Sequence, residues 1–156
     1  MQVLVDTSVW SLALRRAPAA ALAVTSDVAS VGTLKTTART HEQAAVSTLR
    51  DLISDGRACM VGAIRQELLS GIKSAQQFGA LSAALKGFED IALLQSDYEL
   101  AAEFFNTCRS KGVQGSQTDF LICAAASIRK LPILTTDQDF VLYSQHLPID
   151  LTRFNA

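Results

Sequence analysis

The sequence is poor in the residues that build several common kinds of site. It has only 2 histidines and 3 cysteines among 156 residues, and no two cysteines stand in a CxxC pair. This speaks against a zinc site and against a disulfide framework, so Cys59, Cys108 and Cys123 are expected to be small buried residues. Aromatic residues make up 6% of the chain, which speaks against a nucleic-acid platform built from stacked rings.

An excess of charge of either sign is also missing. The 14 Lys and Arg residues nearly balance the 15 Asp and Glu residues, and the net charge is −1. This excludes a strongly basic nucleic-acid coat protein and an acidic disordered tail protein, but it leaves room for a local basic patch. With 49% hydrophobic residues, the chain at 1–156 is predicted to form a single domain with a substantial core.

Long apolar runs are absent as well. No stretch reaches the ~18 apolar residues that a membrane span requires. Arg15 and Arg16, followed by the apolar stretch 17–24, resemble an export signal, but the stretch is short and contains Pro18. A cytoplasmic location without membrane contact is therefore expected.

Short apolar segments alternate with helical patterns along the chain. Phe78, Leu81 and Leu85 have the spacing of a buried helix face, whereas the stretch 17–39 is predicted to be an irregular or partly helical excursion. Short apolar strands joined by helices predict a parallel sheet covered on both faces, in the α/β class. Strands are expected at 3–5, 58–61, 91–94, 133–135 and 149–151, and helices at 9–16, 40–55, 63–70, 74–86, 96–111, 117–130 and 137–144.

Acidic residues stand at the ends of several of these elements. Asp6 and Asp137 each follow the carboxyl end of a strand, which is where parallel sheets bind ligands. Glu67 and Asp119 lie on helices that could frame the same cleft, and Asp139 is close by. Each acid also has a structural interpretation: a helix cap for Asp6 or Asp119, a solvated helix residue for Glu67, and turn residues for the last two.

Taken together, the acids favour a metal site. Four carboxylates brought close to one another would repel and would raise the pKa of at least one of them, and a bound divalent cation would remove that cost. Oxygen ligands suit Mg²⁺ or Mn²⁺ better than zinc. A site of this kind can activate a water molecule and polarise a phosphate, so hydrolysis of phosphodiester bonds is the chemistry that fits it.

Four segments in this order resemble the successive motifs of PIN-domain ribonucleases. They are VLVDTSVW at 3–10, IRQELLSG at 64–71, TDFLICAA at 118–125 and ILTTDQDF at 133–140. The resemblance covers nearly the whole chain, and the overall size is similar to that of VapC-type toxins of toxin–antitoxin pairs. The stretch 17–39 is longer than in compact members of the family.

The resemblance implies a three-layer α/β/α sandwich with a central parallel sheet of about five strands. It implies an endoribonuclease that depends on Mg²⁺ or Mn²⁺, an RNA substrate, a homodimer, and inhibition by a cognate antitoxin. The implied catalytic acids are Asp6, Glu67, Asp119 and Asp137, and the implied metal ligands are Asp6, Asp119, Asp137 and Asp139.

The resemblance leaves some roles open. The fourth acid could be Asp137 or Asp139. Thr7 or Ser8 could orient Asp6 or a metal-bound water, and Thr136 could form a hydrogen bond within the site.

RNA binding requires basic side chains that contact phosphate. The candidates near the motif ends and loops are Arg15, Arg16, Arg65, Lys73, Arg109 and Lys111, each of which could equally be an ordinary surface charge.

Two other functions remain as alternatives. The first is a PIN-like module that has lost catalysis and only binds RNA or protein. The second is a phosphatase with Asp6 as nucleophile, although Ser8 stands where such an enzyme has its second acid.

Overall fold

The computed structural model describes residues 1–16 and 37–154, and for residues 15, 16 and 37–39 it describes only the backbone. Most of the expected excursion at 17–39 therefore lies outside the described residues. Its last three residues are helical, because the next helix begins at Thr37 and not at Thr40 as expected.

Three short strands and seven helices make up the described part of the chain. The helix boundaries lie close to the predicted ones, and the largest shift at a helix start concerns the helix that begins at Thr37. The elements are β1 (Val3–Val5), α1 (Thr7–Arg16), α2 (Thr37–Ser54), β2 (Ala58–Cys59), α3 (Gly62–Leu69), α4 (Ala75–Leu85), α5 (Gln95–Ser110), α6 (Gln117–Arg129), β3 (Ile133–Leu134) and α7 (Asp139–Ser144).

The strands form a parallel sheet in the order β2-β1-β3. Leu4 pairs with Cys59 on one side and with Ile133 on the other, so β1 is the central strand. The ladder continues one residue beyond β1, where the Asp6 amide donates to the Leu134 carbonyl at 2.9 Å. Asp6 therefore stands at the middle of the carboxyl edge of the sheet.

The expected sheet of about five strands is wrong in its strand count. The segments 91–94 and 149–151 do not form strands in the described structure. Only single bridges mark these two edges, Met60 with Asp90 and Ile133 with Leu151. Next to β2, the segment 91–94 forms one hydrogen bond with its neighbour, from the Ile91 amide to the Met60 carbonyl. Helix α5 then begins at Gln95, which leaves little chain for a longer strand.

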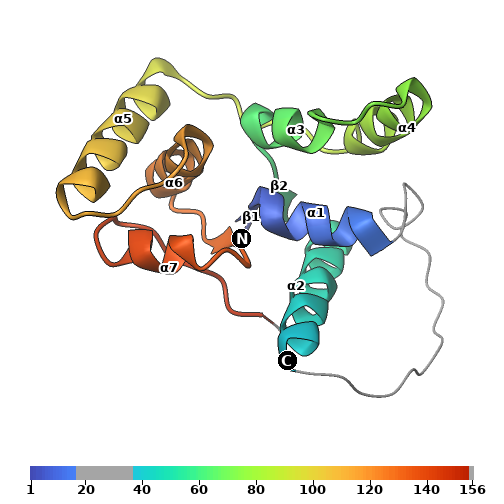
Figure 1. Cartoon of the computed structure of the whole chain (residues 1–156), viewed down its shortest axis with the longest axis horizontal. Helices are drawn as coiled ribbons and strands as arrows, with labels where there is room; N and C mark the ends of the chain where they lie inside the picture. The colour runs from blue at the N-terminus through green and yellow to red at the C-terminus, as the bar shows by residue number, and fades with distance from the viewer. Residues whose placement is uncertain (17–36, 155–156) are drawn as a thin grey trace.

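Helices cover both faces of the sheet. All three residues of β1 are buried, although successive side chains of a strand point to opposite faces. Figure 1 shows the strands between two groups of helices, α1 to α4 on one side and α5 to α7 on the other. The α/β class and the layered arrangement thus agree with the prediction from short apolar strands.

A buried ion pair joins the two helices α5 and α6. Arg129, at the end of α6, contacts both carboxylate oxygens of Asp97, which is 1% exposed. The same guanidinium donates to the Ala92 and Ala125 carbonyls at 3.1 Å each. Because α6 carries Asp119 at its other end, this pair helps fix the helix that presents that acid.

Helix α4 is the least covered of the helices. Leu85 is fully buried, but Phe78 is 42% exposed and Leu81 is only partly buried. The expected burial of all three residues is therefore wrong for Phe78. The reason is that α4 packs mainly against α3, at the edge of the molecule (Figure 1), so no second element covers its outer side among the described residues.

All three cysteines are free and buried, as expected from their number and spacing. No helix within residues 1–16 and 37–154 has both the length and the hydropathy to cross a membrane.

Candidate active site

Three acidic side chains from distant parts of the sequence meet at the carboxyl edge of the sheet. Asp6 follows β1, Asp137 follows β3, and Asp119 lies in the first turn of α6. Burial and the nearby charge of Asp119 raise the pKa of Asp6, although hydrogen bonds oppose the shift. Burial, together with the charge of Asp137, raises the pKa of Asp119 in the same way. The charge of Asp119 thus acts on Asp6, and the charge of Asp137 acts on Asp119.

Asp6 is the most buried of these acids, at 4% exposed. The Thr135 hydroxyl donates to its Oδ2 at 2.9 Å, and the Ser8 amide approaches the same oxygen at 3.4 Å. Its main-chain carbonyl accepts from the Val9 amide at 3.1 Å, which begins helix α1. Asp6 thus stands at the start of α1, as its capping interpretation suggested, and at the carboxyl edge of the sheet, where the sequence placed the candidate site.

Two hydroxyl groups connect the ends of β1 and β3. The Asp137 amide donates to Thr135 Oγ1 at 3.0 Å, and the Thr136 amide donates to Ser8 Oγ at 3.1 Å. Ser8 Oγ and Thr135 Oγ1 are 3.4 Å apart. Ser8 therefore has a bridging role, whereas Thr136 contributes its main-chain N–H to this network. Thr135 was not singled out from the sequence, because its contact with Asp6 spans almost the whole chain.

Asp119 is held by one helix cap and one tyrosine. Ser116 Oγ accepts from the Asp119 amide at 3.0 Å, so Ser116 caps α6 as its sequence position suggested. The Asp119 carboxylate accepts a hydrogen bond at 2.8 Å from the hydroxyl of Tyr143, which is fully buried. Burial and the neighbouring carboxylates raise the pKa of Tyr143, so its hydroxyl keeps its proton and remains a donor.

A glycine makes room for this tyrosine. A Cβ atom added to Gly115 would lie 2.3 Å from the Tyr143 hydroxyl oxygen and 2.9 Å from a ring carbon of Phe120. Only glycine therefore fits at this position without displacing Tyr143. Neither Gly115 nor Tyr143 was among the residues predicted from the sequence; the signal there is a glycine directly before Ser116, the cap of the acidic helix α6.

Glu67 lies at the margin of the site. It is exposed on α3, and its carboxylate accepts from the Thr7 hydroxyl at 2.7 Å. Because Thr7 is the residue after Asp6, this bond connects α3 to the end of β1. The structure thus places Glu67 next to the cluster through Thr7, while Asp6, Asp119 and Asp137 form its centre.

Asp137 and Asp139 differ in their surroundings. The Asp137 Oδ1 accepts from the Asp139 amide at 2.9 Å, which fixes the Asp137 side chain at the start of α7. Asp139 is exposed, whereas Asp137 is partly buried and its charge acts on Asp119. Both charges also contribute to the raised pKa of Tyr143.

The donor set suits a hard divalent cation. No three of the His, Cys, Asp and Glu side chains in the described part of the chain surround a common point at metal-binding distance. Mg²⁺, however, is commonly held by one or two carboxylates and completes its shell with water. Asp6 and Asp119 supply two such carboxylates. Burial disfavours the negatively charged form of both acids, and a bound cation would stabilise that form. The residues present therefore fit a magnesium or manganese ion.

Arg65, one of the candidates for phosphate contact, has a structural role. Its guanidinium forms an ion pair with Asp90 at 2.9 Å and donates to the Leu85 carbonyl at 2.8 Å. It also donates to the Phe88 carbonyl. These bonds fasten the chain after α4 to α3, so the Arg65 guanidinium is engaged within the protein.

The remaining basic candidates differ in position. Lys73 is exposed between α3 and α4, and Lys111 is exposed at the end of α5. Arg109 lies over the Phe105 ring, 5.7 Å from its centre. The side chains of Arg15 and Arg16 lie outside the described residues.

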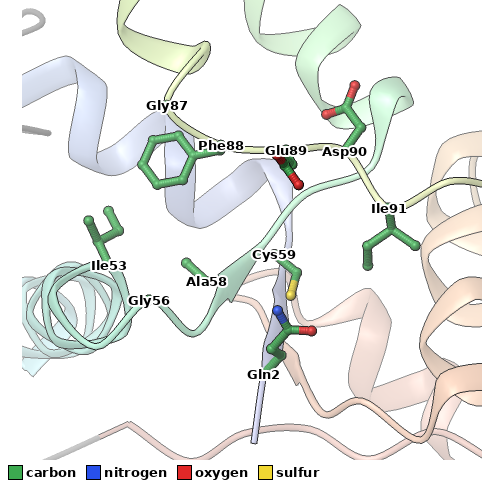
Figure 2. A pocket seen from close by; sticks show the side chains of 10 residues that line it. All are labelled: Gln2, Ile53, Gly56, Ala58, Cys59, Gly87, Phe88, Glu89, Asp90 and Ile91. Atoms are coloured by element: carbon green, nitrogen blue, oxygen red, sulfur yellow. The ribbon is translucent and has the colours of Figure 1, made fainter.

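A separate pocket of about 390 Å³ lies between β2 and the segment 87–91 (Figure 2). Gln2 and Gly56 line it, and they precede β1 and β2 respectively. In Figure 2 the Asp90 carboxylate points away from Gln2 and Cys59, and Arg65 holds it. None of the five candidate acids lines this pocket, so it is distinct from the acidic site.

Comparison with protein families matches the chain to the PIN domain over residues 3–144. A comparison with curated proteins found no significant match. The matched range contains β1, β3 and all five acids of the candidate site. The chain therefore belongs to the PIN domain family, whose members are generally metal-dependent nucleases.

Proposed function

We propose that this protein is an endoribonuclease that depends on Mg²⁺ or Mn²⁺ and hydrolyses phosphodiester bonds of RNA. The observation that carries the proposal is the buried Asp6 carboxylate at the centre of the sheet edge, next to Asp119. Burial of two neighbouring carboxylates is costly unless a cation compensates for it. A binding module for RNA alone has no need of such a pair, because RNA phosphates are themselves negative.

The proposed roles follow from the surroundings of each acid. Asp6 and Asp119 would hold the cation, and when bound it would lower the pKa of a water molecule and neutralise charge on the phosphate. The Thr135 and Tyr143 hydroxyls orient these two carboxylates by donating to them. We assign the fourth acid to Asp137 and not to Asp139, because the charge of Asp137 acts on Asp119 and its side chain is fixed.

Glu67 and Asp139 complete the proposed acidic set from its rim. Both are exposed, so their carboxylates are accessible to water and to the substrate. Thr7 holds Glu67 close to the end of β1. We propose Glu67 as a catalytic acid of the site and Asp139 as an additional ligand where a second cation binds.

The proposal is tested by incubating the purified protein with total cellular RNA. Discrete cleavage products are expected with Mg²⁺ or Mn²⁺, and none with EDTA. Asp119→Asn should abolish cleavage, whereas Asp51→Asn, which changes an exposed acid on α2, should leave it unchanged. Equal cleavage by wild type and Asp119→Asn would refute the proposed site. Cation binding without cleavage of any RNA would favour the binding-module alternative.

We further propose that the protein is the toxin of a type II toxin–antitoxin pair, and that it acts as a homodimer in the cytoplasm. The size of the chain and the order of its four motifs support it. The exposed Phe78 on the sparsely covered helix α4 offers an apolar contact for an antitoxin. Co-purification with the product of the neighbouring small gene, and inhibition of cleavage by it, are expected; the absence of a stable complex would reject this role.

A further inference from the structure

A hollow of about 550 Å³ opens beside the acidic site, on the side of α2 and α7. Its volume lies within the range of pockets that bind small molecules and single nucleotides. Thr135 and Asp137 line the hollow and also belong to the acidic network. A group bound in the hollow would therefore be a direct neighbour of a phosphate held at the carboxylates.

The walls of this hollow combine an aromatic pair with polar groups. The rings of His41 and Phe154 lie edge to face, with centres 4.5 Å apart. Arg153 and Gln138 are exposed and line the same hollow. Thr152 adds a hydroxyl whose oxygen is buried and has no hydrogen-bond partner among the described residues.

These groups match the chemistry of a nucleobase. Single-stranded RNA is recognised by bases that stack on aromatic rings and by hydrogen bonds to their edges. The His41–Phe154 pair provides ring surface, Gln138 provides an amide that both donates and accepts, and Arg153 provides a cation for the adjoining backbone. A platform of many aromatic rings, which the composition speaks against, is not needed to bind one base.

We propose that this hollow binds the nucleobase next to the phosphate that is cleaved, and so determines the sequence preference of the enzyme. This proposal rests on the proposed RNA substrate but on none of the metal chemistry. Its central contact is a base against the His41–Phe154 pair, with the neighbouring phosphate directed past Asp137 toward Asp6 and Asp119. Arg153, which was not a candidate from the sequence, is the cation assigned to the RNA backbone here.

The test measures RNA binding without catalysis. A fluorescein-labelled single-stranded RNA of mixed sequence is titrated with metal-free protein in EDTA, and its anisotropy gives Kd. His41→Ala and Phe154→Leu should each weaken binding about 5- to 10-fold, near the lower end of the effect expected for one stacked base. His146→Ala is the matched control, because His146 is the other histidine and is also exposed; its Kd should not change.

The second measurement compares cleavage positions in Mn²⁺. In the wild type, one base should be enriched next to the cut, and His41→Ala should reduce that enrichment while cleavage continues. Unchanged Kd and unchanged base preference in His41→Ala and Phe154→Leu would overturn the pocket and leave the nuclease intact. Binding that depends on His41 in a protein that cleaves no RNA would support the pocket and reject the nuclease. A wild type that binds no RNA in EDTA would overturn the pocket as well.

Discussion

The hydrogen bond from Tyr143 to Asp119 provides a sensitive test of how the site is held together. Tyr143→Phe removes only the hydroxyl that donates to the Asp119 carboxylate at 2.8 Å. The ring contacts with Phe120 and Phe140, at centre distances of 5.0 and 5.2 Å, are retained. The substitution therefore leaves no large cavity and isolates the contribution of the hydrogen bond.

The expected loss follows from the charge of the acceptor. A hydrogen bond to a charged group contributes about 1.5–3 kcal/mol, and the remaining solvent access of the partly buried Asp119 lowers this to about 1–1.5 kcal/mol. For a chain of 156 residues, this predicts a fall in Tm of about 2–6 °C in metal-free protein. Tyr98→Phe is the matched control, because Tyr98 is 56% exposed, and its Tm should not change.

The same substitution should change the pH dependence of cation binding. The Tyr143 hydroxyl lowers the pKa of Asp119, against the larger effect of burial that raises it. Without the hydroxyl, the pKa rises further, so Asp119 keeps its proton up to a higher pH and cation binding begins at a higher pH. Mn²⁺ titration between pH 4 and 7 measures this shift. If Tm and the onset of binding were both unchanged in Tyr143→Phe, Tyr143 would have no positioning role.

Three further predictions concern stability. Gly115→Ala should lower the free energy of unfolding by about 1–3 kcal/mol, because its Cβ would collide with Tyr143. Gly79→Ala should stabilise the protein instead, because Gly79 is at an exposed helix position where an added Cβ meets nothing within 4 Å. Chemical denaturation compares the two variants. The pKa of Asp6 is raised in the folded state above its ordinary value of 3.8. The metal-free protein should therefore lose stability as the pH rises from the ordinary pKa to the folded pKa, and Asp6→Asn should remove this loss and raise Tm at pH 7. A lower Tm for Asp6→Asn than for the wild type in EDTA would contradict this prediction. The pair with Arg129 lowers the pKa of Asp97, so its stabilisation should be present at neutral pH and lost as the pH falls through the folded pKa. Asp97→Asn should lower the free energy of unfolding by about 2–3 kcal/mol at pH 7. This is less than the loss expected for a fully buried pair, because the Arg129 side chain is partly exposed to solvent. An unchanged midpoint of unfolding in urea would refute the stabilising role of the pair.

The sequence predicted those parts of the site that depend on local position. Asp6 and Asp137 follow apolar strands, so their proximity could be inferred from the topology of parallel strands. Asp119 follows a helix cap, and the sequence predicted only that its helix could frame the same cleft. The helices were predicted within a few residues because their caps and glycines are local signals. The strands expected at 91–94 and 149–151 could not be predicted reliably from local sequence, because a strand forms only where a neighbouring strand offers several consecutive partners. The structure has single bridges at these two places instead.

The residues that support the acids could not be predicted in this way. Thr135 meets Asp6 across 129 positions of the sequence, and Tyr143 reaches Asp119 only because Gly115 leaves space for it. Arg65 shows the opposite case. A basic residue beside a motif suggested RNA contact, but its bonds to Asp90 and to two carbonyl groups could be seen only in the folded chain.

We propose that Asp6 and Asp119 form a cation site at the carboxyl edge of the sheet. Calorimetric titration of Mn²⁺ into the metal-free protein at pH 7 tests it most directly, with Asp6→Asn, Asp119→Asn and the exposed-acid control Asp51→Asn measured alongside. The wild type and Asp51→Asn should show the same saturable binding, and each of the other two variants should lose it while remaining folded by circular dichroism. Wild-type affinity in folded Asp6→Asn, or no binding of Mn²⁺ by the wild type, would contradict the claim.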